Sequence, residues 1–313
     1  MKIACITPDN KRDYTCEQIL EGFASLGHQL IVSDPGNGIN NFAMSDVEFL
    51  DASKDADLLL IFFGKQRGNR SPRRYLANEL GLPKEKIFYI CGSEWSCTGW
   101  ESGDQATASL SDPSRRRGEP WIDEEMFQKC GKYFKRECYP QDLIRGIIPL
   151  PFAMAKRHIM TNPINKDIDI FCSFGHTKTG MRREAIEVVQ NFKKKVEQYK
   201  NLNIVVKNGM SQEEYTNTLK RSRIVIDAFG GGDTNDRFWE GVGAQACVLY
   251  QRYNIVFPNP FEDWKQAVSW SNVSELANCI ERLAYGTEAN QIGIRGFNHA
   301  LQYHTVELRA KKY

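Results

Sequence analysis

The sequence has no CxxC pair, only five histidines, and no apolar run near the roughly 18 residues that a membrane span needs. The histidines lack metal-ligand spacing, which argues against a structural zinc site. The nine cysteines are an odd number, and several sit in apolar, strand-like runs, which indicates reduced and mostly buried thiols. The net charge of +2 is nearly balanced, so the chain as a whole carries no nucleic-acid or membrane signature.

The amino terminus and the length set two further expectations. The opening stretch MKIACITPDN enters a strand-like run without the apolar core of a secretory signal, so we expect a cytoplasmic protein without a membrane span. A chain of 313 residues exceeds the roughly 100 to 200 residues of a usual single domain, so two domains are expected. Its 41% hydrophobic and 26% charged residues are typical of a globular protein.

The first half of the chain alternates apolar runs with helical patterns. Residues 15–28 have the spacing of an amphipathic helix, with Ile19, Phe23 and Leu26 on its apolar face. Strands that alternate with helices imply a parallel sheet with right-handed crossovers. The predicted strands are 2–7, 29–34, 55–64 and 85–92. We therefore predict a Rossmann-like domain over residues 1–150.

A second series follows the proline-containing stretch 146–167, which suits an interdomain connection. Helical patterns at 181–199 and 211–222 alternate with apolar runs. The predicted strands are 168–175, 203–209, 223–229 and 246–251. We predict a second Rossmann-like domain at 165–290, facing the first across a cleft, and a helix at 291–313 that by analogy crosses back. The fold class is α/β.

Three consecutive glycines, Gly230 to Gly232, stand between an apolar strand pattern and a helix. Ligands of parallel α/β sheets sit at the carboxyl ends of the strands, where loops and helix amino termini meet. A loop without side chains lets backbone amides approach an anion, and the next helix adds the positive end of its dipole. A diphosphate suits this arrangement.

Glu240 lies about one turn into that helix if Asp233, Thr234 or Asn235 caps it. A carboxylate there can accept two hydrogen bonds from neighbouring hydroxyls, and a ribose offers such a pair. The glycines and Glu240 together indicate a nucleotide site. The alternative is a flexible turn followed by a solvated glutamate, and spacing alone does not choose between the two.

The segment RIVIDAFGGGDTNDRFWEGVGAQACVLY resembles the nucleotide-sugar segment of GT-B glycosyltransferases, in which a small-residue loop precedes a helix of the form RFWEALACGA. The chain ends in a pattern, HTxxxRA, that resembles the spore-maturation (CgeB-like) glycosyltransferases. IDIFCSFGHTKTGMRRE is similar to the opening strand and loop of that family's donor domain, and KYFKRECYP and IIPLPFA to its interdomain approach. The resemblance covers the second half well and the first half only in topology. The residues of the terminal pattern are His304, Thr305, Arg309 and Ala310.

The resemblance implies a role for each matching residue. Glu240 matches the glutamate that holds the donor ribose, and Arg182 or Arg183 matches a basic position that neutralises phosphate. Lys178 is a second cation candidate, because a departing nucleoside diphosphate gathers negative charge and a metal-free site needs cations or helix dipoles. Each cation could instead be solvated, and His176 suits either phosphate contact or a turn. The implied donor-binding residues are Gly231, Gly232, Glu240, Lys178, Arg182, Arg183 and His176.

The chain departs from the common retaining pattern at one position. Retaining GT-B enzymes often carry a second glutamate eight positions earlier, and this chain has Gly232 there. Asp233 is the residue that can replace it, so Asp233 is a catalytic candidate. The stereochemistry of transfer is therefore left open.

Two polar loops are expected on the acceptor side. One loop, 96–119, follows a strand whose end should face the cleft, and the other spans 64–74. Their cations, with Trp95 and Trp100, would suit an anionic acceptor, but the favoured interpretation is that these cations are solvated and locally balanced. Glu94, at a strand end, is the candidate catalytic base if transfer inverts configuration.

The sequence therefore predicts a metal-independent glycosyltransferase without a cofactor. It would move a sugar from a nucleoside diphosphate sugar to an acceptor hydroxyl on a glycan, a protein or, less favoured, a modified nucleic acid. A nucleotide-sugar epimerase would share the architecture but needs paired acid and base groups around the sugar, and no convincing pair is present. A non-catalytic nucleotide-sugar binding protein is the other alternative, and it predicts binding without transfer or hydrolysis.

Overall fold

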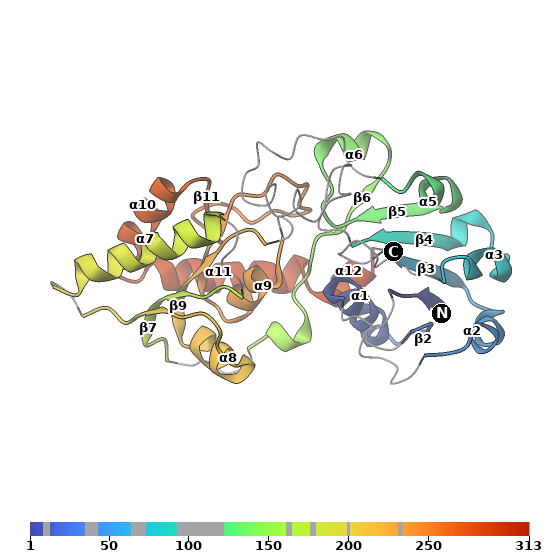
Figure 1. The fold of residues 1–313 in the computed structure, drawn as a ribbon, viewed down its shortest axis with the longest axis horizontal. Coiled ribbons are helices and arrows are strands. Elements are labelled where there is room, and N and C mark those ends of the chain that lie inside the picture. The colour runs from blue at the N-terminus through green and yellow to red at the C-terminus, as the bar shows by residue number, and fades with distance from the viewer. Residues whose placement is uncertain are drawn as a thin grey trace.

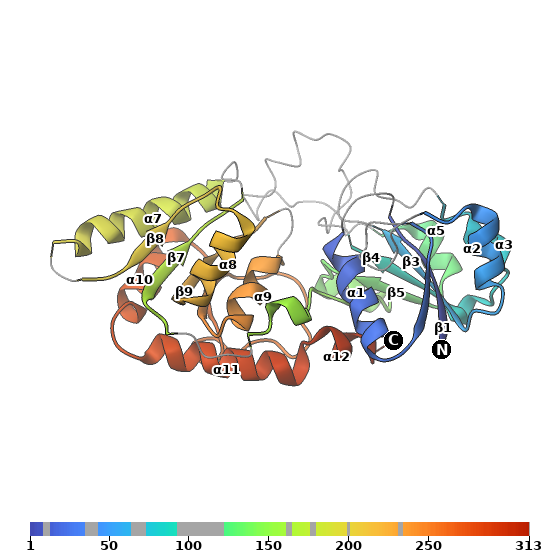
Figure 2. The same cartoon turned by 90° about the horizontal axis from the view of Figure 1, so that it is seen from below.

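The protein forms two lobes, each built around one parallel β-sheet (Figure 1). The two sheets lie beside each other along the long axis of the molecule (Figure 2). The computed structural model describes residues 1–8, 13–34, 43–63, 73–92, 122–160, 165–175, 180–198, 201–230 and 234–312.

The first sheet has six parallel strands in the order β2-β1-β3-β4-β5-β6. Its strands are β1 Lys2–Ile6, β2 Gln29–Val32, β3 Leu58–Phe63, β4 Ile87–Cys91, β5 Lys132–Lys135 and β6 Ile148–Pro149. Successive side chains of a strand point to opposite faces. Ile3 and Cys5 of β1 therefore enter one core, while Ala4 and Ile6 enter the other. Burial on both faces explains the continuous apolar runs in the sequence.

The second sheet has five parallel strands in the order β11-β10-β9-β7-β8. Its strands are β7 Ile168–Cys172, β8 Ile204–Val206, β9 Ser222–Asp227, β10 Cys247–Gln251 and β11 Val268–Trp270. Ile170 of β7 pairs with Ile204 and Ile224 and enters the larger core. Phe171 and Val225 face the opposite core, so this sheet is also covered on both sides.

Helices connect the strands and cover both sheets. Those of the first lobe are α1 Tyr14–Ser25, α2 Asp46–Ser53, α3 Leu76–Leu80, α5 Glu124–Lys129 and α6 Pro140–Ile144. Those that follow are α7 Gly180–Val196, α8 Gln212–Lys220, α9 Asp236–Gly243, α10 Val273–Leu283, α11 Glu288–Tyr303 and α12 Val306–Ala310. Two short 3₁₀ helices are η1 Lys84–Lys86 and η3 Lys156–His158.

Two Rossmann-like domains were predicted from the sequence, and the paired sheets confirm them. The stretches KYFKRECYP and IIPLPFA, interpreted as an interdomain approach, also supply β5 and β6 to the first sheet. Lysines at both ends of β5 interrupt its apolar character, and β6 has only two residues, one of them Pro149. β5 is short and β6 is a two-residue edge strand, so neither leaves much pattern to find.

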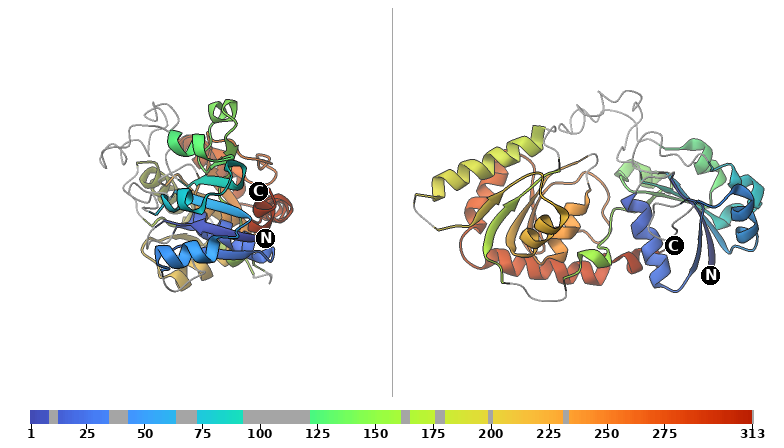
Figure 3. Two further views of the ribbon diagram at one scale, coloured as in Figure 1. Left: turned by 90° about the vertical axis from the view of Figure 1, so that its right-hand side faces the viewer. Right: turned by 60° about the horizontal axis from the view of Figure 1, so that its bottom comes forward.

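The chain returns to the first lobe at its end. α11 runs along the second lobe, and α12 lies against α1 (Figures 1 and 3). A Cβ at Gly22 of α1 would lie 2.4 Å from the Val306 carbonyl oxygen, so only glycine allows this close approach. Met154, in the connection between the lobes, accepts from Val306 N at 3.2 Å and donates to the His304 carbonyl at 2.8 Å.

The terminal HTxxxRA pattern has a packing explanation. The fully buried His304 ring accepts from Arg309 Nη2 at 3.0 Å through Nδ1 and donates through Nε2 to the Asn259 carbonyl at 2.8 Å. Burial lowers the pKa of His304 to about 2, so the ring is neutral. Thr305 caps α12 by accepting from Leu308 N at 3.3 Å. These residues fix the terminal helices against both lobes.

Candidate active site

The candidate site begins where β9 ends. β9 lies between β10 and β7 and delivers the chain to Gly230 at the carboxyl edge of the second sheet. Asn235 caps α9, because its Oδ1 accepts from Phe238 N at 3.3 Å. Phe238 and Trp239 are buried, as their apolar character predicts, and they anchor α9 in the core. α9 is therefore rigidly placed behind the glycine loop.

Glu240 is a half-buried residue of α9 that faces α8. Tyr215 of α8 donates its hydroxyl to Glu240 Oε2 at 2.7 Å. Burial raises the pKa of Tyr215 above its usual value, so the hydroxyl keeps its proton and remains a donor. Sequence reasoning missed Tyr215, because a single tyrosine in a polar helix has no motif. The contact fixes one oxygen of the carboxylate in place.

A pocket of about 300 Å³ opens beside Glu240. This volume is at the lower end of the roughly 300 to 1,000 Å³ that small-molecule sites occupy. Asp236, on the same wall, accepts from Gln18 Nε2 of the first lobe and from Arg157 Nη2 of the connection, each at 3.0 Å. Both lobes therefore contribute to the pocket. Its polar lining residues are Tyr14, Arg157, His158, Gln212, Tyr215, Thr216, Asp236 and Glu240.

Two arginines pack against the Phe174 ring, of which Arg182 is buried and Arg237 keeps 14% of its side chain exposed. The guanidinium carbons of Arg182 and Arg237 lie 5.4 Å and 4.7 Å from the ring centroid. Arg182 Nη2 lies 2.7 Å from the position that a Cβ would take at Gly230, so a side chain there would displace this guanidinium. Fixed positive charge thus lies directly beside the start of the glycine loop.

Arg183 has a different environment from its neighbour. Its side chain is 70% exposed, and its Nε lies 3.8 Å from Glu187 Oε1 on the same helix. Surface pairs of this kind contribute little, about 0.3–0.5 kcal/mol. Of the two arginines that the sequence offered for phosphate, the structure places Arg182 at the loop and directs Arg183 to solvent.

Asp227, the last residue of β9, is a buried carboxyl group beside these cations. Its Oδ1 lies 4.0 Å from Arg237 Nη1, and Asn235, Arg182 and Glu240 are also near. Burial raises the pKa of Asp227 to about 6, against the attraction of the arginines. Burial therefore outweighs the positive charges in setting this group's titration.

We expect Asp227→Asn to change how stability depends on pH. A carboxyl pKa raised from 3.8 to about 6 stabilises the fold below 3.8 and loses that contribution as the pH rises through 6. His158 and His304, whose pKa values burial lowers to about 3 and about 2, act in the opposite direction below pH 6.5. The free energy of unfolding of wild type therefore combines opposing contributions as the pH changes. The difference between the variant and wild type isolates the contribution of Asp227.

The measurement is chemical denaturation of both proteins at several pH values from 7.5 to 4. The free energy of unfolding of the variant minus that of wild type should fall by on the order of 3 kcal/mol across this range. A difference that stays constant with pH would show that Asp227 titrates normally.

Six predicted site residues lie outside the described residues. Glu240 and Arg182 are described, and the charge of each acts on the buried carboxyl group of Asp227. Arg183, also described, points away from them. The six that cannot be placed are Glu94, His176, Lys178, Gly231, Gly232 and Asp233.

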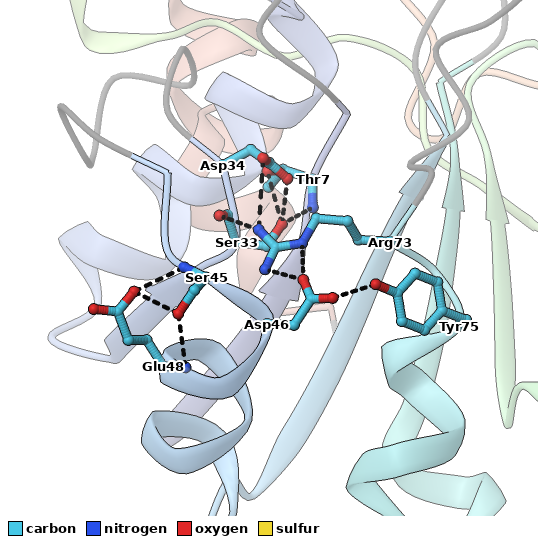
Figure 4. Close-up of polar contacts among 8 residues, drawn as sticks. All are labelled: Thr7, Ser33, Asp34, Ser45, Asp46, Glu48, Arg73 and Tyr75. Carbon is cyan, nitrogen blue, oxygen red and sulfur yellow. Dashed lines mark hydrogen bonds and ion pairs between the residues drawn. The ribbon is translucent and has the colours of Figure 1, made fainter.

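A polar network lies at the carboxyl ends of β1 and β2 in the first lobe (Figure 4). Arg73 donates Nε to Asp46 Oδ1 and Nη1 to the Ser33 carbonyl, both at 2.8 Å. The Ser33 hydroxyl donates to Asp34 Oδ2 at 2.8 Å and accepts from Thr7 N at 3.1 Å. Arg73 thus ties together the chain entering α2 and the chain entering α3.

Arg74 is also neutralised locally. Its Nη1 lies 3.1 Å from Asp123 Oδ2 and its Nη2 lies 2.8 Å from Glu125 Oε2. In the described part of the 64–74 loop, both arginines are therefore balanced by carboxylates. This agrees with the interpretation that these cations are locally balanced. The partners are Asp46, Asp123 and Glu125, which are distant in sequence from Trp95 and Trp100.

The described residues also bear on the expected thiols, metal ligands and membrane spans. The eight described cysteines are buried thiols outside any disulfide, which confirms the prediction for them. Within the described ranges, no three histidine, cysteine or acidic residues are grouped so as to hold a metal ion. None of the helices in the described part of the chain combines the length and hydrophobicity that crossing a bilayer requires.

Comparison with protein families gives a match over the second half. Residues 163–313 match the family described as "Glycosyl transferase-like". No curated protein matches the chain by sequence.

Solved structures match almost the whole chain. A glycosyltransferase from Rickettsia africae ESF-5 has a TM-score of 0.59 at 11% identity, with 99% of this chain and 96% of that chain covered. Anabaena HepE in complex with UDP-glucose has a TM-score of 0.56 at 10% identity, with 100% and 98% covered. A putative UDP-N-acetylglucosamine 2-epimerase from Listeria monocytogenes has a TM-score of 0.52 at 10% identity, with 96% and 94% covered. The chain therefore has the GT-B fold, and its second half matches the glycosyl transferase-like family.

Proposed function

We propose that this protein is a glycosyltransferase that moves a sugar from a nucleoside diphosphate sugar to an acceptor hydroxyl. The observation that carries the proposal is that Glu240 lines a pocket of about 300 Å³ and lies on α9, the helix that follows the Gly230–Gly232 stretch in the chain. The family match over residues 163–313 covers this site.

In this proposal, the ribose of the donor binds at Glu240. Tyr215 occupies Oε2 at 2.7 Å and orients the carboxylate, and the hydroxyl pair of a ribose would donate to the group so positioned. Hydrogen bonds to a charged acceptor contribute roughly 1.5–3 kcal/mol each, which is enough to select a ribose over a ligand without hydroxyls.

The diphosphate would lie against the glycine loop and the amino terminus of α9. Negative charge builds up on the leaving nucleoside diphosphate as the bond to the sugar breaks, and preorganised dipoles and cations lower the energy of that state. Arg182, held beside Gly230, supplies a fixed cation there, and Lys178 and His176 are proposed to add to it. These groups supply what a metal would otherwise supply, so we propose metal-independent transfer without a cofactor.

The acceptor hydroxyl would enter from the first lobe. Glu94 is the proposed base for an inverting transfer, and Asp233 the proposed sugar contact for a retaining one. The acceptor would be a glycan, protein or modified nucleic acid, and the local pairing of Arg73 and Arg74 favours one that is not strongly anionic. The HTxxxRA pattern supports the CgeB-like branch, and a cytoplasmic location is part of the proposal.

The GT-B fold alone does not separate transferases from epimerases, because the Listeria epimerase shares it. The family match supports the transferase. A donor screen by thermal shift tests the proposal, with uridine, guanosine and adenosine diphosphates and their sugar conjugates. HepE binds UDP-glucose, so uridine conjugates come first. We expect one conjugate to raise the unfolding temperature in proportion to the logarithm of its concentration. No response to any of them would contradict the proposal.

A further inference from the structure

The chain leaving β5 carries three consecutive charged residues that are all buried. Lys135 is fully buried, and Arg136 and Glu137 are each 1% exposed. They lie at the carboxyl edge of the first sheet, the edge at which α/β proteins bind ligands. Buried charges are costly unless they are paired, so each must have a defined partner.

Two of these charges are neutralised inside the first lobe. Lys135 Nζ donates to Asp142 Oδ2 at 2.7 Å. Arg136 Nε donates to Glu137 Oε1 at 3.0 Å, and its guanidinium lies 4.8 Å from the centroid of the Phe152 ring. The Arg136–Glu137 pair therefore carries no net charge.

Glu137 also contacts the second lobe. Its Oε1 accepts the hydroxyl of Thr234 at 3.2 Å, and Thr234 is itself only 3% exposed. The next residue, Cys138, accepts through its carbonyl from Val256 N at 2.7 Å. Thr234 directly follows Gly230–Asp233, so a carboxylate of the first lobe holds the residue at the end of the donor loop.

A run of three glycines cannot fix its own conformation. Glycine loses more backbone freedom on ordering than any other residue, and it brings no side chain with which to recover the cost. The described residues on either side of 231–233 therefore matter for the donor site. Gly230 lies against Arg182 at one end, and Thr234 is held by Glu137 at the other.

We propose that Glu137 is a positioning residue for the donor site. Through Thr234 it fixes the chain just before the Asn235 cap of α9, so that the first lobe positions the amino terminus of the helix that carries Glu240. Arg136 cancels the charge of Glu137, so the contact holds the loop without repelling a phosphate. The inference rests on the proposed donor site.

The test compares Thr234→Val, which keeps the shape and removes the hydroxyl, with Thr234→Ser, which keeps the hydroxyl. We expect Thr234→Val to bind the donor identified by the screen about tenfold more weakly in calorimetric titration. Loss of roughly one hydrogen bond has an effect of this size. Thr234→Ser should bind within about twofold of wild type. The acceptor KM should not change in either variant. General damage to the fold would instead raise both the donor dissociation constant and the acceptor KM.

A double-mutant cycle with Glu137→Ala, which removes the acceptor oxygens, separates the Glu137–Thr234 contact from a direct contact of Thr234 with the donor. If Thr234 acts through Glu137, the double variant should lose no more affinity than the more damaged single variant. Additive losses, or a Thr234→Val protein that binds as wild type does, would overturn the inference while leaving the donor site intact. If wild type binds no nucleoside diphosphate, the proposed function is contradicted, and so is the positioning role of Glu137.

Discussion

Glu240→Gln is expected to weaken donor binding by ten- to a hundredfold. The amide keeps one acceptor oxygen but turns an NH₂ group toward hydroxyls that need an acceptor, and it removes the negative charge. Loss of a hydrogen bond to a charged group costs roughly 1.5–3 kcal/mol, which gives this range. Calorimetric titration of the donor measures the loss directly, and kcat should fall less than kcat/KM, because ribose contacts form in both ground and transition states.

Glu214→Gln is the matched control for this variant. Glu214 lies on α8, next to Tyr215, but its carboxylate is partly exposed and pairs with Lys207. We expect its donor affinity to match that of wild type. Equal donor affinity of wild type and Glu240→Gln would show that Glu240 does not bind the donor and that the glycines form only a turn.

Arg182→Gln should reduce kcat by a hundred- to a thousandfold. Its Nη2 lies 2.7 Å from the position that a Cβ would take at Gly230, and fixed charge aimed at a leaving group gives effects of about this size. The charge that it would stabilise grows during bond breaking, so kcat should suffer more than donor affinity. Steady-state kinetics with saturating donor and acceptor measure the loss.

Arg183→Gln offers a control one residue away with the same change in charge. Its side chain is 70% exposed, so we expect activity within twofold of wild type. Unfolding temperatures of both variants must accompany the kinetics, because Arg182 also packs on Phe174. Similar losses in the two variants would mean that general positive charge, and not the Arg182 contact, supports the reaction.

The sequence does contain a signal that separates these two arginines. Ala185, Val189, Phe192 and Val196 form the buried stripe of α7, spaced by three and four residues. Extending the stripe by three residues toward the amino terminus reaches Arg182. Helical periodicity therefore puts Arg182 on the face that packs against the sheet. A charged residue at the start of a buried stripe, beside a strand's carboxyl end, is a strong candidate for a site.

The strands were predictable where both faces of the sheet are covered. Runs such as Leu58–Phe63 have no polar interruption and resemble only a buried strand. β5 was missed because Lys135 looks like a surface residue, yet it is fully buried against Asp142. Pairing between residues seven positions apart compensates its charge, and local patterns of hydrophobicity do not contain that information.

The donor site was predictable in part. The glycine run and Glu240 follow one another in the chain, so they form a motif. Tyr215 and Glu137 lie on other elements, and their contacts with Glu240 and Thr234 depend on how helices and lobes pack. Nothing in the local sequence of either residue indicates the partner. Such residues become visible only when the tertiary structure brings them to the motif.

The central claim is that Glu240 binds the ribose of the donor, and one thermodynamic cycle tests it most directly. The nucleoside diphosphate selected by the screen and its 2′-deoxy and 3′-deoxy forms are titrated into wild type and Glu240→Ala. Wild type should prefer the ribose form about tenfold or more, and the variant should bind all three equally, because the partner of the missing hydroxyl is gone. An undiminished preference in the variant would contradict the account.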